Sequence, residues 1–446
     1  MQRKRFPAGW RNAVAQRVLV HCDRQRRDKA VGDREALLGN FSRSCAPEVL
    51  WQKPLTWFLA LALAASGVSV PAALRAAPVP FFGTHRIPTS EFSHMVQGFS
   101  EPGGDFPSDN LTSNELSYQH IIGKLKEMGI SGGAYIGVGP EQNFTYIAQI
   151  RPRIAFLVDI RRQAIVQHLL YKAIFHRAEN RAQFLALLFS KPFPATRFDR
   201  DDTFEELLNY IRDAPTSREA FLANLKTIQN TIEQDFQIPL SPTDVQGLAH
   251  VYSAFWQDNL TVGFRFGHGG KIPGPWGFPE LRDLLLATDL NGKRRNFLAR
   301  EEDYQFVRKL QNQNRVIPVV GDVSGTKALR TVANYLRKND YVVSAFYTSN
   351  VEEYLYEFRI FNRFEENVGA LPVNDRSVFI RAVRSSWSPH SFWTLNQQIT
   401  PFLQKIAIFL NDYRAGLLPD YGKLVTTHYI SGESHAEAML PMEGRK

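Results

Sequence analysis

Short apolar segments alternate with helical segments along most of the chain, and this alternation constrains the fold more than any other feature of the sequence. Strands are expected at 134–138 and 154–159, and helices after them at 144–149 and 164–175. Strands that alternate with helices favour a parallel sheet, because each parallel connection has to cross the sheet through a helix. The sequence therefore predicts an α/β fold, with a mostly parallel sheet and helices on both faces.

A long helical stretch interrupts this alternation at about 177–260, and we interpret it as a large helical insertion. It is followed by a loop rich in Gly and Pro at 263–277. Loops of this length are often functional lids. The insertion is expected to contain helices at 181–189, 204–211 and 218–236. After the loop we expect a helix that starts at the acidic run 301–303, strands at 316–320, 341–347, 377–383 and 424–430, and helices at 326–337, 351–358 and 402–413.

The net charge of +9 is concentrated in a basic leader at residues 1–53. This leader holds 12 basic and 5 acidic residues, whereas the remaining 393 residues hold 41 basic and 39 acidic ones. The folded part is therefore nearly neutral and has no general attraction for a phosphate backbone. We accordingly expect no nucleic-acid partner.

Residues 54–77 have the order of a secretion signal. Lys53 precedes an apolar core at 55–65, and small residues follow it. This arrangement favours a cleaved signal peptide, with translation starting near Val49 or Leu50. The alternative is a membrane anchor at 54–74, although this segment is short for a span that needs about 20 residues. The protein is thus expected to be exported, or to meet a membrane only through this segment.

The cysteine and histidine positions give no metal pattern in the folded part. Both cysteines, Cys22 and Cys45, lie in the leader, so a disulfide framework and a cysteine-based zinc site are excluded beyond it. The pair His168 and His176 lacks metal-ligand spacing, and we expect no metal. The remaining parts are a lead-in with an N-terminal helix, 78–128 (helix at 113–128), and a tail, 431–446.

Four groups of residues follow the predicted strands and could form one ligand pocket. Ligands of open α/β sheets bind at the carboxyl ends of the strands. Each group also has a structural alternative: the glycines could shape a turn, Asp159 could cap a helix or pair with Arg161 or Arg162, and Asp322 could cap the helix near Thr326. The four groups are Gly137 and Gly139, Asp159, Asp322, and the run Tyr347, Ser349 and Asn350.

The glycine spacing favours a ligand without phosphates. A dinucleotide-binding turn has a third glycine, and Gln142 occupies that position here. No phosphate-binding GxxxxGK[ST] motif occurs either. S-adenosylmethionine is therefore preferred to NAD, FAD or a nucleoside triphosphate.

The segments 134–143 and 156–162 resemble the first two motifs of class I S-adenosylmethionine-dependent methyltransferases. Over about 90–360 the chain also resembles an uncharacterised bacterial family with a methyltransferase-like Rossmann fold, through 105–115, 319–325 and 344–351. This resemblance implies a Rossmann-like domain at 129–430 that binds an adenosyl ligand. The implied binding residues are Gly137 and Gly139 at the methionine and ribose end, Asp159 at the ribose, Asp322 at the adenine, and a closing segment with Asp109, Asn110 and Glu115.

Two departures from the methyltransferase pattern leave the activity open. Tyr135 replaces the usual acid before the glycine turn, and no Asn-Pro-Pro-Tyr motif occurs. If methyl transfer takes place, Tyr347, Ser349 and Asn350 are the candidates for the acceptor side. The alternative is a non-catalytic binding protein with a degenerate fold. A hydrolase using Asp322 and His268 is disfavoured, because 321–325 lacks the spacing of a nucleophile elbow. The sequence predicts no oligomeric state.

Overall fold

A six-stranded sheet forms the centre of the computed structural model, which describes residues 85–106, 108–194, 198, 203–265, 278–384 and 399–432. The strand order is β3-β2-β1-β4-β5-β6, and β6 alone runs antiparallel to its neighbour. The α/β class and the mostly parallel sheet are confirmed. The strands are β1 (Ala134–Gly137), β2 (Ile154–Asp159), β3 (Val316–Val320), β4 (Val343–Ser349), β5 (Val378–Arg384) and β6 (Ile399–Lys405).

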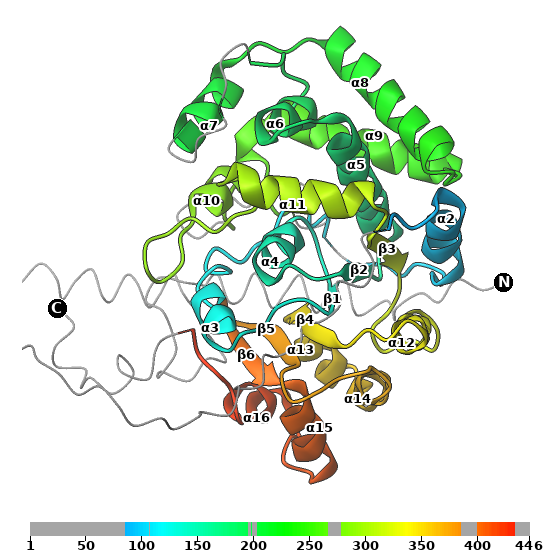
Figure 1. Cartoon of the computed structure of the whole chain (residues 1–446), viewed down its shortest axis with the longest axis vertical. Coiled ribbons are helices and arrows are strands. Elements are labelled where there is room, and N and C mark those ends of the chain that lie inside the picture. Colours follow the sequence, from blue (N-terminus) through cyan, green and yellow to red (C-terminus); the bar gives the residue numbers. More distant parts are fainter. Residues whose placement is uncertain are drawn as a thin grey trace, which may run out of the picture. The chain divides into compact units, whose positions relative to one another are not determined.

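The central strands are apolar along their whole length because helices cover the sheet on both sides. Every residue of β1, β2 and β3 is buried, as expected for parallel strands shielded on two faces. Figure 1 shows α4 (Gln142–Ile150) and α5 (Arg162–Arg177) on one side, with α12 (Ala328–Lys338), α14 (Phe361–Gly369) and α15 (Ile406–Arg414) on the other.

The predicted helical insertion lies between β2 and β3, and its helices pack over α5. The longest of them, α9 (Pro242–Asp258), begins at a capping box in which Ser241 and Asp244 satisfy each other's backbone amides. Figure 1 shows the insertion as a separate helical layer above α5. Its other helices are α6 (Arg181–Leu188), α7 (Phe204–Asp213) and α8 (Arg218–Asn230), followed before β3 by α10 (Leu281–Leu286) and α11 (Glu301–Asn312).

The helix predicted at 113–128 is mostly wrong. Only α3 (Ile122–Glu127) is helical there, and residues 113–121 form turns and irregular chain. Polar side chains of this segment bond to distant elements: the Ser117 hydroxyl, for example, donates to the Ile399 carbonyl at 2.5 Å. Hydrogen bonds of this kind hold the segment 113–121 in an irregular conformation, although the spacing of its residues favours a helix. The lead-in instead contains a helix that was not predicted, α2 (Thr89–Gly98).

The C-terminal predictions also need correction. The segment predicted as one helix at 402–413 begins as strand β6, because its first residues pair with β5, and only then continues as α15. The strand predicted at 424–430 is wrong: residues 424–426 form the end of helix α16 (Tyr421–Thr426), which Asp420 caps at its N-terminus, and 427–429 are irregular. Only Ile430 keeps a strand-like contact, an isolated bridge to Leu403.

Several predicted segments lie outside the described residues. These are the basic leader, the apolar segment 54–77, most of the Gly/Pro-rich loop with His268, and most of the tail. Within the described part of the chain, no helix is both long enough and apolar enough to span a membrane.

Candidate functional site

A cavity of about 160 Å³ lies at the carboxyl ends of β1, β2, β3 and β4. An engineered cavity of about 150 Å³ holds a benzene ring, so this space accommodates a ring-sized group without rearrangement. The strand order reverses between β1 and β4, which is the position where open α/β sheets bind ligands. Of the ten residues predicted from the sequence, eight line the cavity: Asn110, Glu115, Gly139, Asp159, Asp322, Tyr347, Ser349 and Asn350.

The two glycines after β1 have different places. Gly139 lines the cavity with φ +77°, a conformation that favours glycine, and a Cβ at this residue would have no atom within 4 Å. Gly137 does not line the cavity, and a Cβ there would overlap Asn143 Oδ1 and the Tyr135 ring. Its role is therefore close packing. Asn143 braces the turn by donating to the carbonyls of Val138 at 2.9 Å and Pro140 at 2.8 Å.

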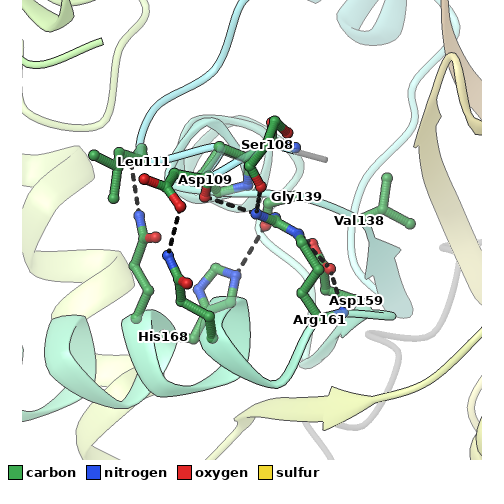
Figure 2. Close-up of polar contacts among 12 residues, drawn as sticks. Ser108, Asp109, Leu111, Val138, Gly139, Asp159, Arg161 and His168 are labelled. Atoms are coloured by element: carbon green, nitrogen blue, oxygen red, sulfur yellow. Dashed lines mark hydrogen bonds and ion pairs between the residues drawn. The ribbon is translucent and has the colours of Figure 1, made fainter. Parts of the chain in front are cut away.

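The carboxylate of Asp159 is held by Arg161. The guanidinium donates from Nε to Oδ1 at 3.1 Å and from Nη2 to Oδ2 at 2.9 Å, and both side chains are buried. The same guanidinium donates from Nη1 to the Asp109 carbonyl at 2.6 Å, which joins the closing segment to the end of β2 (Figure 2). The alternative in which Asp159 pairs with Arg161 is thus realised. Because a carboxylate has about four acceptor positions, Oδ2 can still accept a ligand hydroxyl.

Asp322 lines the cavity just after the end of β3, the strand that pairs with β2. Its Oδ1 accepts bonds from the backbone amide and the hydroxyl of Ser324, both at 2.8 Å. It therefore caps a tight turn and not α12, whose N-cap position is Lys327. Glu101 supports the position by accepting the Asp322 amide at 2.8 Å.

The end of β4 brings three predicted residues to the cavity. The pairing of β4 with β5 shifts register between Tyr347 and Ser349, and Ser349 has φ 54°. Bulges of this kind redirect side chains and occur beside functional sites. The Ser349 hydroxyl donates to Glu115 at 2.5 Å, and Asn350 donates to Glu353 at 3.1 Å.

Glu115 is the most deeply buried acid of the cavity lining, with 1% of its surface exposed. Its Oε1 accepts bonds from the Tyr347 hydroxyl at 2.7 Å and from Ser349, while Oε2 accepts from Gln142 Nε2 at 3.1 Å. Burial raises the pKa of this carboxyl, although the three hydrogen bonds oppose the rise.

Asp109 lies outside the cavity lining. Its carboxylate contacts His250 at 3.2 Å and Gln163 at 3.4 Å, so its side chain fixes the closing segment to α9 and α5. Asn110, which follows it, has φ 41° and lines the cavity. Asn110 and Glu115 of the predicted closing segment therefore line the cavity, whereas Asp109 fixes the start of the segment and does not reach the cavity.

Sequence reasoning did not identify Thr112, Arg161 or Tyr354 as members of the cavity lining. Thr112 is fully buried, and its hydroxyl has no hydrogen-bond partner among the described residues. No local motif marks it, because its position depends on the irregular segment 108–121. The sequence indicates Arg161 only as a structural partner of Asp159.

His168 has a positioning role behind the glycine turn. Its Nε2 lies 2.9 Å from the Gly139 carbonyl, as Figure 2 shows, and burial lowers the pKa of the ring to about 4. The neutral imidazole therefore donates this bond at physiological pH. Within the described ranges, no group of three His, Cys, Asp or Glu side chains could hold a metal ion.

Comparison with known proteins places the chain in a family. Residues 110–411 match the family described as Domain of unknown function (DUF7790). The match covers more than half of the chain and includes all five parallel strands and every cavity-lining residue except Phe106. The chain belongs to this family. No curated protein matches the chain.

Proposed function

We propose that this protein binds S-adenosylmethionine or a related adenosyl ligand in the cavity, within a Rossmann-like domain of the class I methyltransferase type. One observation carries the proposal. A glycine turn after β1, an acid after β2, an acid after β3 and a polar run after β4 line one cavity where the strand order reverses. Adenosyl ligands of Rossmann-like domains lie along these strand ends.

The charge of the cavity supports a ligand without phosphates. Its described lining contains three carboxylates, Glu115, Asp159 and Asp322, and a single guanidinium, Arg161. That guanidinium already bonds to Asp159 and to backbone carbonyls. Phosphate sites instead gather free cations and backbone amides. S-adenosylmethionine, whose sulfonium and ammonium groups are positive, suits this lining better.

A second function, ligand binding without catalysis, is favoured by a specific contact. The carboxylate expected to hold ribose is already engaged by Arg161, and the first strand carries Tyr135 in place of an acid. Methyl transfer and binding alone are separated by incubating the protein with labelled S-adenosylmethionine and an extract of its native cell. If the label is transferred to an acceptor, the protein is a methyltransferase; if S-adenosylmethionine binds and no label is transferred, the protein only binds it.

Isothermal titration calorimetry of the full chain tests the proposal. We expect heat on titration of S-adenosylmethionine and S-adenosylhomocysteine, and loss of binding in Asp159→Asn. A matched control is Asp303→Asn, because Asp303, on α11, is a buried acid paired with Arg151 at the end of α4 and does not line the cavity. The absence of heat at millimolar concentrations of both ligands would refute adenosyl binding.

The expected export of the protein stays a proposal. N-terminal sequencing of the protein from its native cell tests it: removal of residues 1 to about 76 supports a cleaved signal. A mature chain that retains residues 1–53 would exclude cleavage.

A further inference from the structure

The carboxylate of Glu115 faces the cavity without a cationic partner. All three of its hydrogen-bond donors, from Tyr347, Ser349 and Gln142, are neutral groups. Among the described residues, no Lys, Arg or His side chain forms an ion pair with it. An ionised carboxylate taken out of water is costly unless a charge pairs with it.

Other buried acids of the protein do have such a partner. Asp159 pairs with Arg161 at 2.9 Å, Asp303 with Arg151 at 2.6 Å, and Glu352 with Arg381 at 2.9 Å. The chain thus supplies cations to several buried carboxylates elsewhere in the fold. Among the described residues, Glu115 and its neighbour Glu141 are buried acids without a cation, and of these two only Glu115 lines the cavity.

The surroundings of Glu115 also suit a positive group. Tyr347 and Tyr354 line the same cavity, and the faces of aromatic rings attract cations. The Thr112 hydroxyl is buried in the same lining as the acid and has no partner among the described residues, so the lining holds an unused polar group. Both features indicate a bound molecule that completes the site.

We propose that Glu115 is the counter-ion of a positively charged ligand group, so that the cavity selects organic cations of the sulfonium or ammonium type over their neutral counterparts. The inference deepens the proposed function and rests on it where the ligand is an adenosyl compound. For that ligand it means that the sulfonium form is held more tightly than the thioether form. The selection is made by the charge at Glu115 and not by the shape of the nucleoside.

The pH dependence of binding has a definite sign. Because burial raises the pKa of Glu115, the free site carries a larger protonated fraction than an exposed glutamate, and binding of a cation releases that proton. Cation affinity should therefore rise with pH. The titratable groups around Glu115 are the phenols of Tyr135, Tyr146 and Tyr347, whose pKa values are all raised by burial, so they stay neutral in this range.

Three other acids near the site also need to be separated from Glu115. Asp159, with its partner Arg161, and Asp322 line the same cavity. Glu141 does not line the cavity but accepts the Ser113 amide at 3.2 Å, and burial raises its pKa to about 7. Glu141→Gln is therefore the matched control, since it neutralises a neighbouring buried acid that does not itself line the cavity, and the Gln side-chain oxygen can still accept the Ser113 amide.

The experiment is calorimetry on the full chain with two pairs of probes. The first pair is S-adenosylmethionine and S-adenosylhomocysteine, and the second is the trimethylsulfonium ion and dimethyl sulfide. We expect the wild type and Glu141→Gln to prefer the cation of each pair by about tenfold or more, the scale of one charged hydrogen bond or ion pair. Glu115→Gln should bind both members of a pair about equally.

Wild-type titrations in two buffers of different ionisation enthalpy provide a test that needs no variant. Proton release on cation binding, and none on binding of the neutral probe, is expected. Equal affinities for charged and neutral probes in the wild type, or an unchanged preference in folded Glu115→Gln, would overturn the inference even if adenosyl ligands bind. If trimethylsulfonium binds through Glu115 but neither adenosyl ligand binds, the cation site stands and the proposed function fails.

Discussion

Glu115 and Glu352 are both fully buried acids, yet the protein treats them differently. On the β5 side, Glu352 bonds to the guanidinium of Arg381, which also lies over the Phe379 ring at 4.0 Å. On the cavity side, Glu115 has neutral donors only. The charge of Glu352 is balanced within the fold, whereas Glu115 has no cationic partner among the described residues. A buried charge left unbalanced at a cavity therefore points to binding more clearly than burial alone does.

The largest expected effect breaks the balanced pair. Arg381→Met leaves Glu352 buried without its cation, and we expect the free energy of unfolding to fall by about 3–5 kcal/mol. Urea denaturation measures this loss. The double variant Arg381→Met, Glu352→Gln should recover part of the loss. A single variant as stable as the wild type would show that the pair is dispensable, and the contrast with Glu115 would disappear.

Lys172 provides an intermediate case, a buried cation with aromatic neighbours. Its ammonium lies 4.4 Å from the Phe92 ring centre, and burial, followed by the charge of Arg86, lowers its pKa to about 7. Below pH 7 Lys172 is charged in both the folded and the unfolded protein, so burial of the charged ammonium lowers the free energy of unfolding by its full amount. Between pH 7 and the unfolded pKa of 10.5 the folded protein loses this proton, and the destabilisation becomes smaller. Lys172→Met should add roughly 2 kcal/mol at pH 6 and less at pH 9 by denaturation. A gain that grows with pH would contradict this.

Glu115→Gln should behave in the opposite way to Arg381→Met, since it removes an unbalanced charge. Because the pKa of Glu115 is raised in the folded protein, its ionisation does not affect the free energy of unfolding below the unfolded pKa of about 4.5. Above the folded pKa the carboxylate is ionised in both the folded and the unfolded protein, and its destabilising effect is largest. We expect a gain of roughly 1 kcal/mol at pH 8 that shrinks toward pH 5. Thermal unfolding over this range tests it. Destabilisation at pH 8 would mean that the neutral donors balance the charge by themselves.

The smallest expected effect concerns the unpartnered hydroxyl in the cavity. Thr112→Val keeps the shape of the side chain, and we expect a change between zero and a gain of about 1 kcal/mol. Ser377→Ala is the comparison, because the Ser377 hydroxyl donates to the Val343 carbonyl at 2.6 Å and is fully buried. That substitution should lose about 1 kcal/mol. Equal losses for both would show that Thr112 has a partner.

The sequence predicted the cavity-bearing strands better than the segments that close the cavity. The bounds of β2 and β3 were predicted to the residue, because continuous apolar runs leave little choice of structure. The strand β6 was missed, since its alternation merges with the helical pattern of α15. Asp159 and Asp322 could be placed from the strand ends. The isolation of the Glu115 charge could not, because it depends on which side chains meet it in three dimensions.

The contact of Arg161 with the carbonyls of Ser108 and Asp109 has a consequence for ligand binding. One guanidinium both engages the acid at the end of β2 and fastens the segment 108–109, which leads into the cavity lining at Asn110. A substitution of Arg161 would therefore free the Asp159 carboxylate and at the same time loosen the segment 108–109, so its effect on binding would combine two opposing changes.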